Sequence, residues 1–200
     1  MVSWKKSRTG EDVPLIDGVC LHSLVNPSQE AQKWAAHRAL ELLGDEVIFV
    51  LGCGGGFHLK ALAKSMPGTE VVGLDLEVSL VEAAVKQGLR VWNVSAVEQI
   101  LVRPELVELL LKPYSVVSYS PSFRSNPESY SRLEKFLLAR NAEDFRRHAY
   151  LRPELRAWIS SFRNDDELVS IHSLCRANLE PDSLVSNKGR LWYVLRELVL

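Results

Sequence analysis

The segment V47-I-F-V-L51 runs directly into the glycine cluster G52-C-G54-G-G56 and then into F57-H-L-K60. A continuous apolar run of this length is typical of a parallel strand, because helices cover both faces of a parallel sheet. The glycines permit a sharp backbone turn into the helix that follows. The stretch therefore predicts a turn at the carboxyl end of a buried strand, which is where ligands bind in open α/β sheets.

Outward from this stretch, strand-like and helix-like segments alternate along the chain. Further strands are expected at 70–75, 89–94 and 114–119. Helices are expected at 56–66, at 78–88 and in two pieces from Ser95, the second starting at Pro104. This alternation implies crossover connections and a parallel sheet with helices on both faces. The predicted fold class is α/β, a Rossmann-like three-layer α/β/α core with a mostly parallel sheet.

Helical additions are expected on both sides of that core. Asn26 as N-cap and Pro27 at the first helical position predict a helix before the core. After the core, Ser125 and Glu128 predict the cap of a long helix. The final stretch, 191–200, has helical spacing, although its Trp-Tyr-Val centre also suits a strand. The expected division is 1–44 as an N-terminal segment and leading helix, 45–125 as a ligand-binding core, and 126–200 as a mainly helical C-terminal portion packed on the core.

The composition describes an ordinary globular chain of 200 residues, with 46% hydrophobic residues, 24% charged residues and a net charge of −1. These values exclude a collagen or a disordered tail. Cys20, Cys53 and Cys175 form no C-x-x-C pair, so we expect reduced thiols and no metal centre. No apolar run approaches the roughly 18 residues of a membrane span. We therefore expect a cytoplasmic protein without a membrane partner.

A ligand site is indicated by the glycine cluster together with Asp75, which ends the second predicted strand 23 positions after Gly52. A carboxylate there can accept hydrogen bonds from both ribose hydroxyls of an adenosine-type ligand. The nicotinamide fingerprint G-x-G-x-x-G fails, because its third glycine falls on Phe57 or Leu59. The cluster has instead the spacing G-x-G-x-G.

This spacing resembles the S-adenosylmethionine loop of Rossmann-fold methyltransferases, over about residues 45–94. The resemblance implies methyl transfer to an acceptor, with no catalytic residue assigned. It implies that Asp75 holds the ribose and that Leu76 packs on the adenine. The cofactor-binding residues expected are Gly52, Gly54, Gly55, Gly56, Asp75, Leu76, Ser118 and Ser120. The chain departs from that family at Val50, where an acidic residue is common, and matches the family's motif after the fourth strand only loosely, at Ser120 and Pro121.

A second resemblance covers about residues 20–130. Three segments occur in the same order as in the N-terminal Rossmann-like domain of motility-associated-factor proteins, a family linked to flagellin glycosylation. They are His22-Ser23 with Asn26-Pro27 and Glu30-Ala31, then Gly54 to Leu59, then Pro121 to Pro127. This resemblance implies a non-catalytic module that binds a nucleotide or a nucleotide sugar.

Each of these residues also has a purely structural interpretation. The glycine cluster can be a tight turn, Asp75 a helix N-cap, Cys53 a small filler and His22-Ser23 a loop feature. The basic residues from Arg140 to Arg156 are interleaved with acidic ones, which favours a solvated, ion-paired face over a nucleic-acid partner. A small-molecule ligand is the expected partner, with the helical C-terminal portion as a candidate homodimer contact.

Overall fold

The computed structural model describes residues 1–42, 45–139 and 142–151. The chain divides into two compact units, Met1–Leu138 and Ala139–Leu200. The first unit holds both sheets and most of the described helices, and the second contributes helix α8 (Ala142–Tyr150). The predictions for residues 152–200, including the choice between helix and strand at 191–200, lie outside the described residues.

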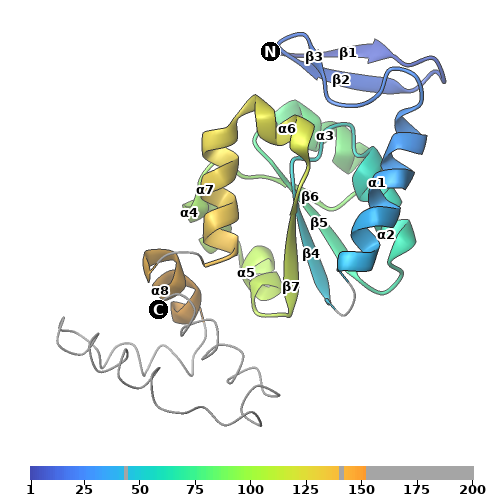
Figure 1. Cartoon of the computed structure of the whole chain (residues 1–200). Helices are drawn as coiled ribbons and strands as arrows, with labels where there is room; N and C mark the ends of the chain where they lie inside the picture. The colour runs from blue at the N-terminus through green and yellow to red at the C-terminus, as the bar shows by residue number, and fades with distance from the viewer. Residues whose placement is uncertain (43–44, 140–141, 152–200) are drawn as a thin grey trace, which may run out of the picture. The chain divides into compact units, whose positions relative to one another are not determined.

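A parallel sheet forms the centre of the first unit (Figure 1). Its strands are β4 (Val47–Leu51), β5 (Glu70–Asp75), β6 (Val91–Asn93) and β7 (Tyr114–Ser118). They lie in the order β6-β5-β4-β7, and every neighbouring pair is parallel. The register pairs Leu51 of β4 with Leu74 on one side and with Ser118 on the other. The segments that follow these three strands therefore meet at one edge of the sheet.

Helices cover both faces of this sheet. Helix α2 (Phe57–Ser65) connects β4 to β5, and α3 (Val78–Lys86) connects β5 to β6. Two helices, α4 (Val97–Leu101) and α5 (Pro104–Leu110), lie between β6 and β7. Right-handed crossovers put the first pair on one face and the second pair on the other, because the last connection runs in the opposite direction across the sheet. Figure 1 shows α1 and α2 on one side of the sheet and α5 on the other. The predicted three-layer α/β/α fold is confirmed.

The core lies mainly between the sheet and the helices around α1 and α2. All five residues of β4 are buried, and Ile48 and Val50 pack in one cluster with Leu59, Leu62 and Leu80. Burying an aliphatic side chain of this size stabilises the fold by about 1.5–3 kcal/mol. The apolar run that predicts a buried strand is thus the centre of the packing.

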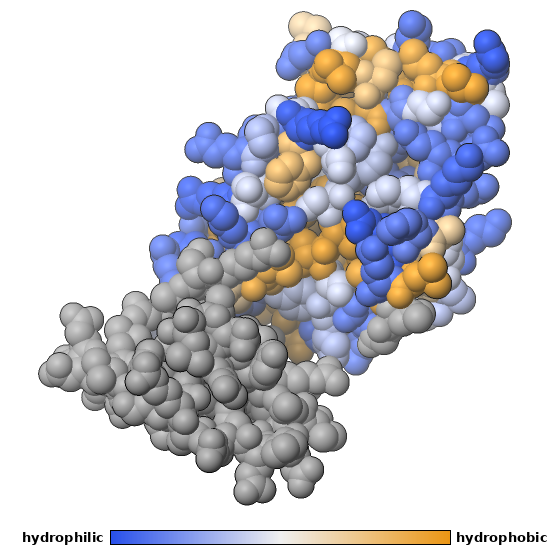
Figure 2. All heavy atoms as spheres, in the orientation of Figure 1, coloured by the Kyte–Doolittle hydropathy of each residue, from blue (hydrophilic) through white to orange (hydrophobic). Residues whose placement is uncertain are grey.

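The N-terminal segment contains a second sheet that the sequence analysis did not predict. Strands β1 (Val2–Lys6), β2 (Asp12–Ile16) and β3 (Val19–Cys20) are antiparallel in the order β1-β2-β3. Figure 2 shows apolar residues at the surface over this sheet, which contributes the exposed side chain of Val19. Asp17 and Gly18 both have positive φ and form the two-residue connection between β2 and β3. Asp-Gly is the preferred sequence of such a hairpin, so this dipeptide was the missed signal.

Helix α1 (Pro27–Glu41) begins as predicted, since the Asn26 side chain accepts a hydrogen bond from the Gln29 amide at 2.8 Å. The predicted cap at Ser125 and Glu128 is wrong. Two helices occupy that region, α6 (Ser120–Ser125) and α7 (Pro127–Leu137), and Asn126 caps the second by accepting from the Ser129 amide. An asparagine followed by proline starts a helix at both places. No helix among the described residues is long and apolar enough to cross a membrane.

Candidate functional site

Asp75 joins the glycine loop, residues 52–56, to the start of helix α3. Its Oδ2 accepts a hydrogen bond from the Cys53 amide at 2.5 Å, and its Oδ1 accepts one from the Glu77 amide at 2.9 Å. The Gly52 amide donates to the carbonyl of Leu74 at 2.8 Å, which extends the β4–β5 pairing by one residue. The carboxylate is fully buried. A buried carboxylate needs such donors, because an unpaired charge in the interior is costly.

Tyr130 of α7 lies beside this carboxylate. Burial, followed by the negative charge of Asp75, raises the pKa of the Tyr130 hydroxyl. Leu76 is half-buried, and its carbonyl accepts from the Asn93 side chain at 2.8 Å. In the described conformation Asp75 thus holds the loop, the strand end and the next helix together, and its expected role toward a ribose stays a prediction.

Protein side chains lie closely against the glycine loop. A Cβ on Gly52 would lie 2.4 Å from the Cβ of Ser122, and a Cβ on Gly54 would lie 2.7 Å from Nε2 of His22. Both glycines have positive φ, +88° and +49°, so a larger residue is disfavoured there on two grounds. Ser122 and His22 therefore occupy the space next to Gly52 and Gly54, where other residues would carry a side chain.

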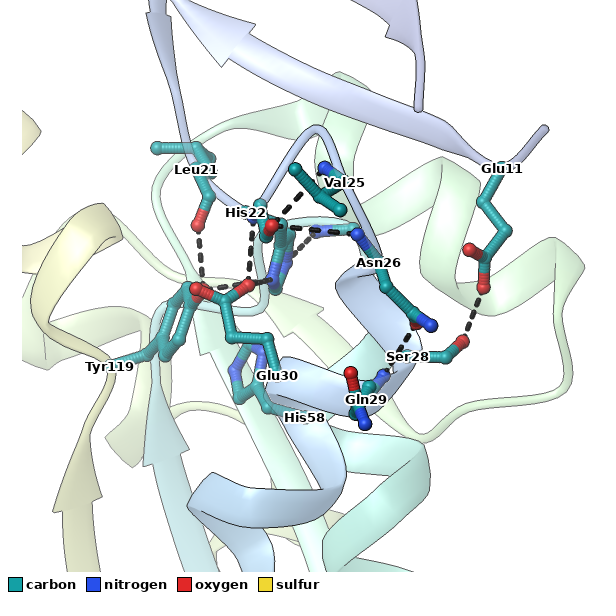
Figure 3. A network of polar contacts seen from close by, with 12 residues as sticks. Glu11, Leu21, His22, Val25, Asn26, Ser28, Gln29, Glu30, His58 and Tyr119 are labelled. Atoms are coloured by element: carbon teal, nitrogen blue, oxygen red, sulfur yellow. Dashed lines mark hydrogen bonds and ion pairs between the residues drawn. The ribbon is translucent and has the colours of Figure 1, made fainter. Parts of the chain in front are cut away.

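His22 is the centre of a buried polar cluster (Figure 3). Its Nε2 accepts a hydrogen bond from the Gly55 amide at 2.9 Å, and its Nδ1 lies 2.8 Å from the Tyr119 hydroxyl. That hydroxyl donates to the carbonyl of Leu21 at 2.6 Å. Because an amide can only donate, Nε2 is the acceptor and Nδ1 carries the proton, which it donates to the hydroxyl oxygen of Tyr119.

His58 stacks face to face on the ring of Tyr119, with centroids 3.8 Å apart, and its centroid lies 5.5 Å from that of His22. Its Nε2 donates to the carbonyl of Gly52 at 2.9 Å, whereas its buried Nδ1 has no hydrogen-bond partner in the part of the chain that the structure describes. Burial, and secondarily the neighbouring His22, hold the pKa of His58 well below its ordinary value. Burial, then the charge of Glu30, raises the pKa of Tyr119. Both rings are thus kept neutral beneath the loop.

Glu30 of α1 borders this cluster on its solvent side. Its carboxylate accepts from the Ser23 amide at 2.8 Å and lies 3.7 Å from Nδ1 of His22. The His22 side chain is 1% exposed and that of Glu30 43%. The interaction with His22 holds the pKa of the Glu30 carboxyl below its ordinary value, although burial opposes this. His22 therefore lies between a buried amide donor and a half-exposed carboxylate.

A small open pocket lies at the carboxyl end of β7. It measures about 240 Å³ and is lined by Ser118, Ser120, Phe123, Arg124 and Glu134. The Ser118 hydroxyl donates to Oε1 of Glu134 at 2.7 Å. The expected cofactor residues are thus not brought together: Ser118 and Ser120 line this pocket, the loop glycines and Asp75 are buried, and Leu76 is half-buried outside the pocket lining.

Sequence reasoning missed the central role of Tyr119 and the contribution of Glu134. Tyr119 directly follows β7, where a side chain at the carboxyl edge of the sheet can reach the glycine loop, and this position was the available signal. Nothing in the sequence distinguished Glu134 from the other charged residues of its helix.

No metal site is found among the described residues, and the thiol of Cys53 is buried. No group of three or more His, Cys, Asp or Glu side chains is arranged to hold a metal ion in residues 1–42, 45–139 and 142–151. Burial, then the charge of Asp75, raises the pKa of the Cys53 thiol well above its ordinary value, which disfavours the nucleophilic thiolate. In α8, Arg147 pairs with Glu143 at 2.6 Å, as expected of a charged helix face.

Comparison with known proteins yields two solved structures and no family. No protein-family model and no curated protein matches the sequence. The two structures are of the plantazolicin methyltransferase BpumL with S-adenosylhomocysteine (SAH), one of them also with a monoazolic desmethylPZN analog. Each matches 70% of this chain at 15% identity with a TM-score of 0.29, and the chain spans 66% of the BpumL chain. The comparisons assign no family. The fold is established by the strand order and register described above.

Proposed function

We propose that this protein binds S-adenosylmethionine at the carboxyl edge of its parallel sheet and transfers the methyl group to an acceptor. The observation that carries the proposal is the joining of the glycine loop after β4 to Asp75 at the end of β5, through the Cys53 amide and the Asp75 carboxylate. A glycine-rich turn beside an acidic strand end is the arrangement that presents amides and a carboxylate to an adenosine-type ligand.

The donors at this edge suit such a ligand. The Gly55 amide points away from the backbone of its own loop and donates to the side-chain nitrogen of His22, an acceptor from outside the loop. A ligand carboxylate or ribose oxygen can take the same bond. Asp75, by contrast, has no exposed surface, so ribose contact requires that the groups packed over it move. Binding is therefore expected to be coupled to a local opening around Asp75, beside which Tyr130 of α7 lies.

S-adenosylmethionine supplies an electrophilic methyl group on a sulfonium. The chain's own contribution is to hold donor and acceptor in line, and positioning of this kind can supply several kcal/mol of the barrier reduction. The pocket at Ser118 and Glu134 lies at the same edge of the sheet, where an acceptor can approach. Glu134 accepts a hydrogen bond from Ser118 there and can likewise accept one from an acceptor hydroxyl or amine.

Calorimetric titration of the full chain tests the proposal, with SAH, adenosine, a nucleoside diphosphate and nucleotide sugars as probes. We expect SAH to bind and to raise the melting temperature, since a ligand at about 100 times its Kd stabilises a fold by roughly 2.7 kcal/mol. Binding of a nucleotide sugar without any response to SAH would remove methyl transfer from consideration.

Two variants locate the site. Asp75→Asn is expected to weaken SAH binding more than about tenfold, because a charge-assisted contact to the ribose is lost. Leu76→Ala tests the same site without removing a buried charge and is expected to weaken binding about three- to tenfold. Leu111→Ala is the matched control, since Leu111 is 45% exposed and lies between α5 and β7 at the amino end of that strand. Equal affinity in Leu76→Ala and Leu111→Ala would place the ligand elsewhere.

A second candidate function is a non-catalytic module for a nucleotide or nucleotide sugar. One observation favours it: the three segments that resemble motility-associated-factor proteins meet around the glycine loop. His22 accepts from Gly55, and Ser122 packs against Gly52. In the titration above, this function predicts a response to a nucleotide or nucleotide sugar and none to SAH.

A further inference from the structure

The space above Gly54 and the amide of Gly55 are both taken by one side chain, the imidazole of His22. We propose that His22 is a latch that holds the glycine loop closed and competes with the ligand for the Gly55 amide. The identity of the ligand rests on the proposed function, whereas the latch itself can be tested without any ligand.

Three contacts fix the imidazole in the closed position. Gly55 donates to Nε2, the Tyr119 hydroxyl accepts from Nδ1, and the ring of Phe57 meets the imidazole edge to face at 5.0 Å between centroids. The missing side chain of Gly54 leaves the room for this approach, because a Cβ there would lie 2.7 Å from Nε2. The loop is thus closely packed against the imidazole.

Release requires only a side-chain movement. Turning His22 away from Gly55 breaks its bonds to Gly55 and Tyr119 but leaves the 1%-exposed Leu21 side chain and the Tyr119–Leu21 hydrogen bond in place. Glu30, whose carboxylate lies 3.7 Å from Nδ1 on the solvent side, is positioned to receive the displaced ring. The Glu30 carboxylate already lies near Nδ1 in the closed position, and in the proposed open position it replaces the Tyr119 hydroxyl as the acceptor from Nδ1.

The first experiment measures amide hydrogen exchange by NMR in the unliganded protein. His22→Ala removes the acceptor, and His22→Gln retains one, since its side-chain oxygen can reach the position of Nε2. We expect the Gly55 amide to exchange at least tenfold faster in His22→Ala than in the unaltered protein and in His22→Gln. The Gly56 amide, which donates to the Cys53 carbonyl at 2.8 Å, is the internal control and should keep its protection in all three.

The second experiment measures SAH affinity in the same three proteins. Loss of one competing hydrogen bond is expected to tighten binding about three- to tenfold in His22→Ala, with His22→Gln close to the unaltered protein. A purely structural role for His22 gives the opposite sign, because a damaged site binds more weakly. Weaker or unchanged SAH binding in His22→Ala overturns the latch.

The two proposals fail in different ways. If SAH binds to none of the three proteins, the proposed function fails and the exchange data decide on the latch. Faster exchange at Gly55 alone, with Gly56 protected, then supports the latch. Unchanged exchange at Gly55, or equal loss of protection at both glycines, overturns it. If His22→Ala does not fold, Tyr119→Phe replaces it, since this change removes the hydroxyl that holds Nδ1 and should speed exchange at Gly55 in the same direction.

Discussion

The loop after β4 and the segment after β7 lie at the same edge of one sheet, yet they use polar groups in opposite ways. The glycine loop is shielded from solvent, since its glycines are buried and its partners His22, His58 and Asp75 are at most 4% exposed. The segment after β7 instead lines an open pocket with Ser118, Ser120, Arg124 and Glu134. The loop after β4 is thus packed inside the fold, whereas the segment after β7 faces solvent.

The difference teaches that a glycine-rich turn is not by itself an open ligand site. A polar group removed from water must be paired within the protein, and around the loop nearly every such group is. Among the side chains next to the loop, the exceptions are Nδ1 of His58 and the Ser122 hydroxyl, both buried without a hydrogen-bond partner among the described residues. Substitutions in the loop should therefore cost stability, and substitutions at the β7 pocket should cost little.

The largest expected effect is that of Gly52→Ala. The new Cβ would lie 2.4 Å from that of Ser122 at a φ of +88°, so overlap adds to backbone strain. We expect a loss of about 3–5 kcal/mol in the free energy of unfolding, measured by urea denaturation.

Gly68→Ala is the matched control, because Gly68 has a φ of +98° with nothing within 4 Å of its added Cβ. It should cost only about 1–2 kcal/mol. Ser122→Gly in the Gly52→Ala background should recover about 1–3 kcal/mol of the loss. Equal costs at Gly52 and Gly68 would show that the loop is not tightly packed.

An intermediate effect is expected from pH, through His58. Burial lowers the pKa of His58 in the folded protein, whereas in the unfolded chain an imidazole has a pKa of about 6.5. Below that value the unfolded chain binds a proton that the folded protein excludes. Stability from this residue is thus fully present above about pH 7 and falls by up to about 1.4 kcal/mol per pH unit as the pH decreases. Urea denaturation between pH 5 and pH 8 measures this slope.

His58→Gln supplies the control for that slope, because its side chain can still donate to the Gly52 carbonyl but does not titrate. We expect the variant to lose the component of the slope due to His58. An identical pH dependence in the two proteins would assign it to other groups.

The smallest effect is expected at the open pocket. Ser118→Ala removes a half-exposed hydroxyl that donates to Glu134, so the free energy of unfolding should fall by less than about 1 kcal/mol. Glu134→Gln keeps an acceptor for the same hydroxyl and should change it less still. Thermal denaturation of the two variants checks this prediction. A loss of stability as large as that of Gly52→Ala would show that the pocket after β7 contributes as much to the stability of the fold as the glycine loop does.

The fold could be predicted from local sequence because its signals are local. The apolar run at 47–51, the asparagine cap at Asn26 and Pro104 at the start of α5 each act within a few residues. The N-terminal sheet was missed because its strands are short and β1 is mostly exposed, although Asp17-Gly18 marks the hairpin between β2 and β3.

The candidate site was harder to predict because its contacts are distant in sequence. The pattern of Gly52, Gly54 and Asp75 predicts where the loop and the strand end meet, and the structure joins them through the Cys53 amide. It cannot predict that His22, more than thirty positions earlier, packs over Gly54, because that contact depends on how the N-terminal sheet lies on the core. The glycines predict that some group approaches the loop backbone closely, but they do not identify that group.

The bond between Tyr119 and Leu21 spans 98 positions of the chain. On a ribosome that adds about 5–20 residues per second, the first hairpin is made roughly 5–20 s before Tyr119 has been polymerised. Until then His22 can contact the glycine loop, but neither His22 nor the Leu21 carbonyl has the Tyr119 hydroxyl as a partner. The packing of the N-terminal sheet and its flanking loop is thus completed only after β7 and Tyr119 have been translated.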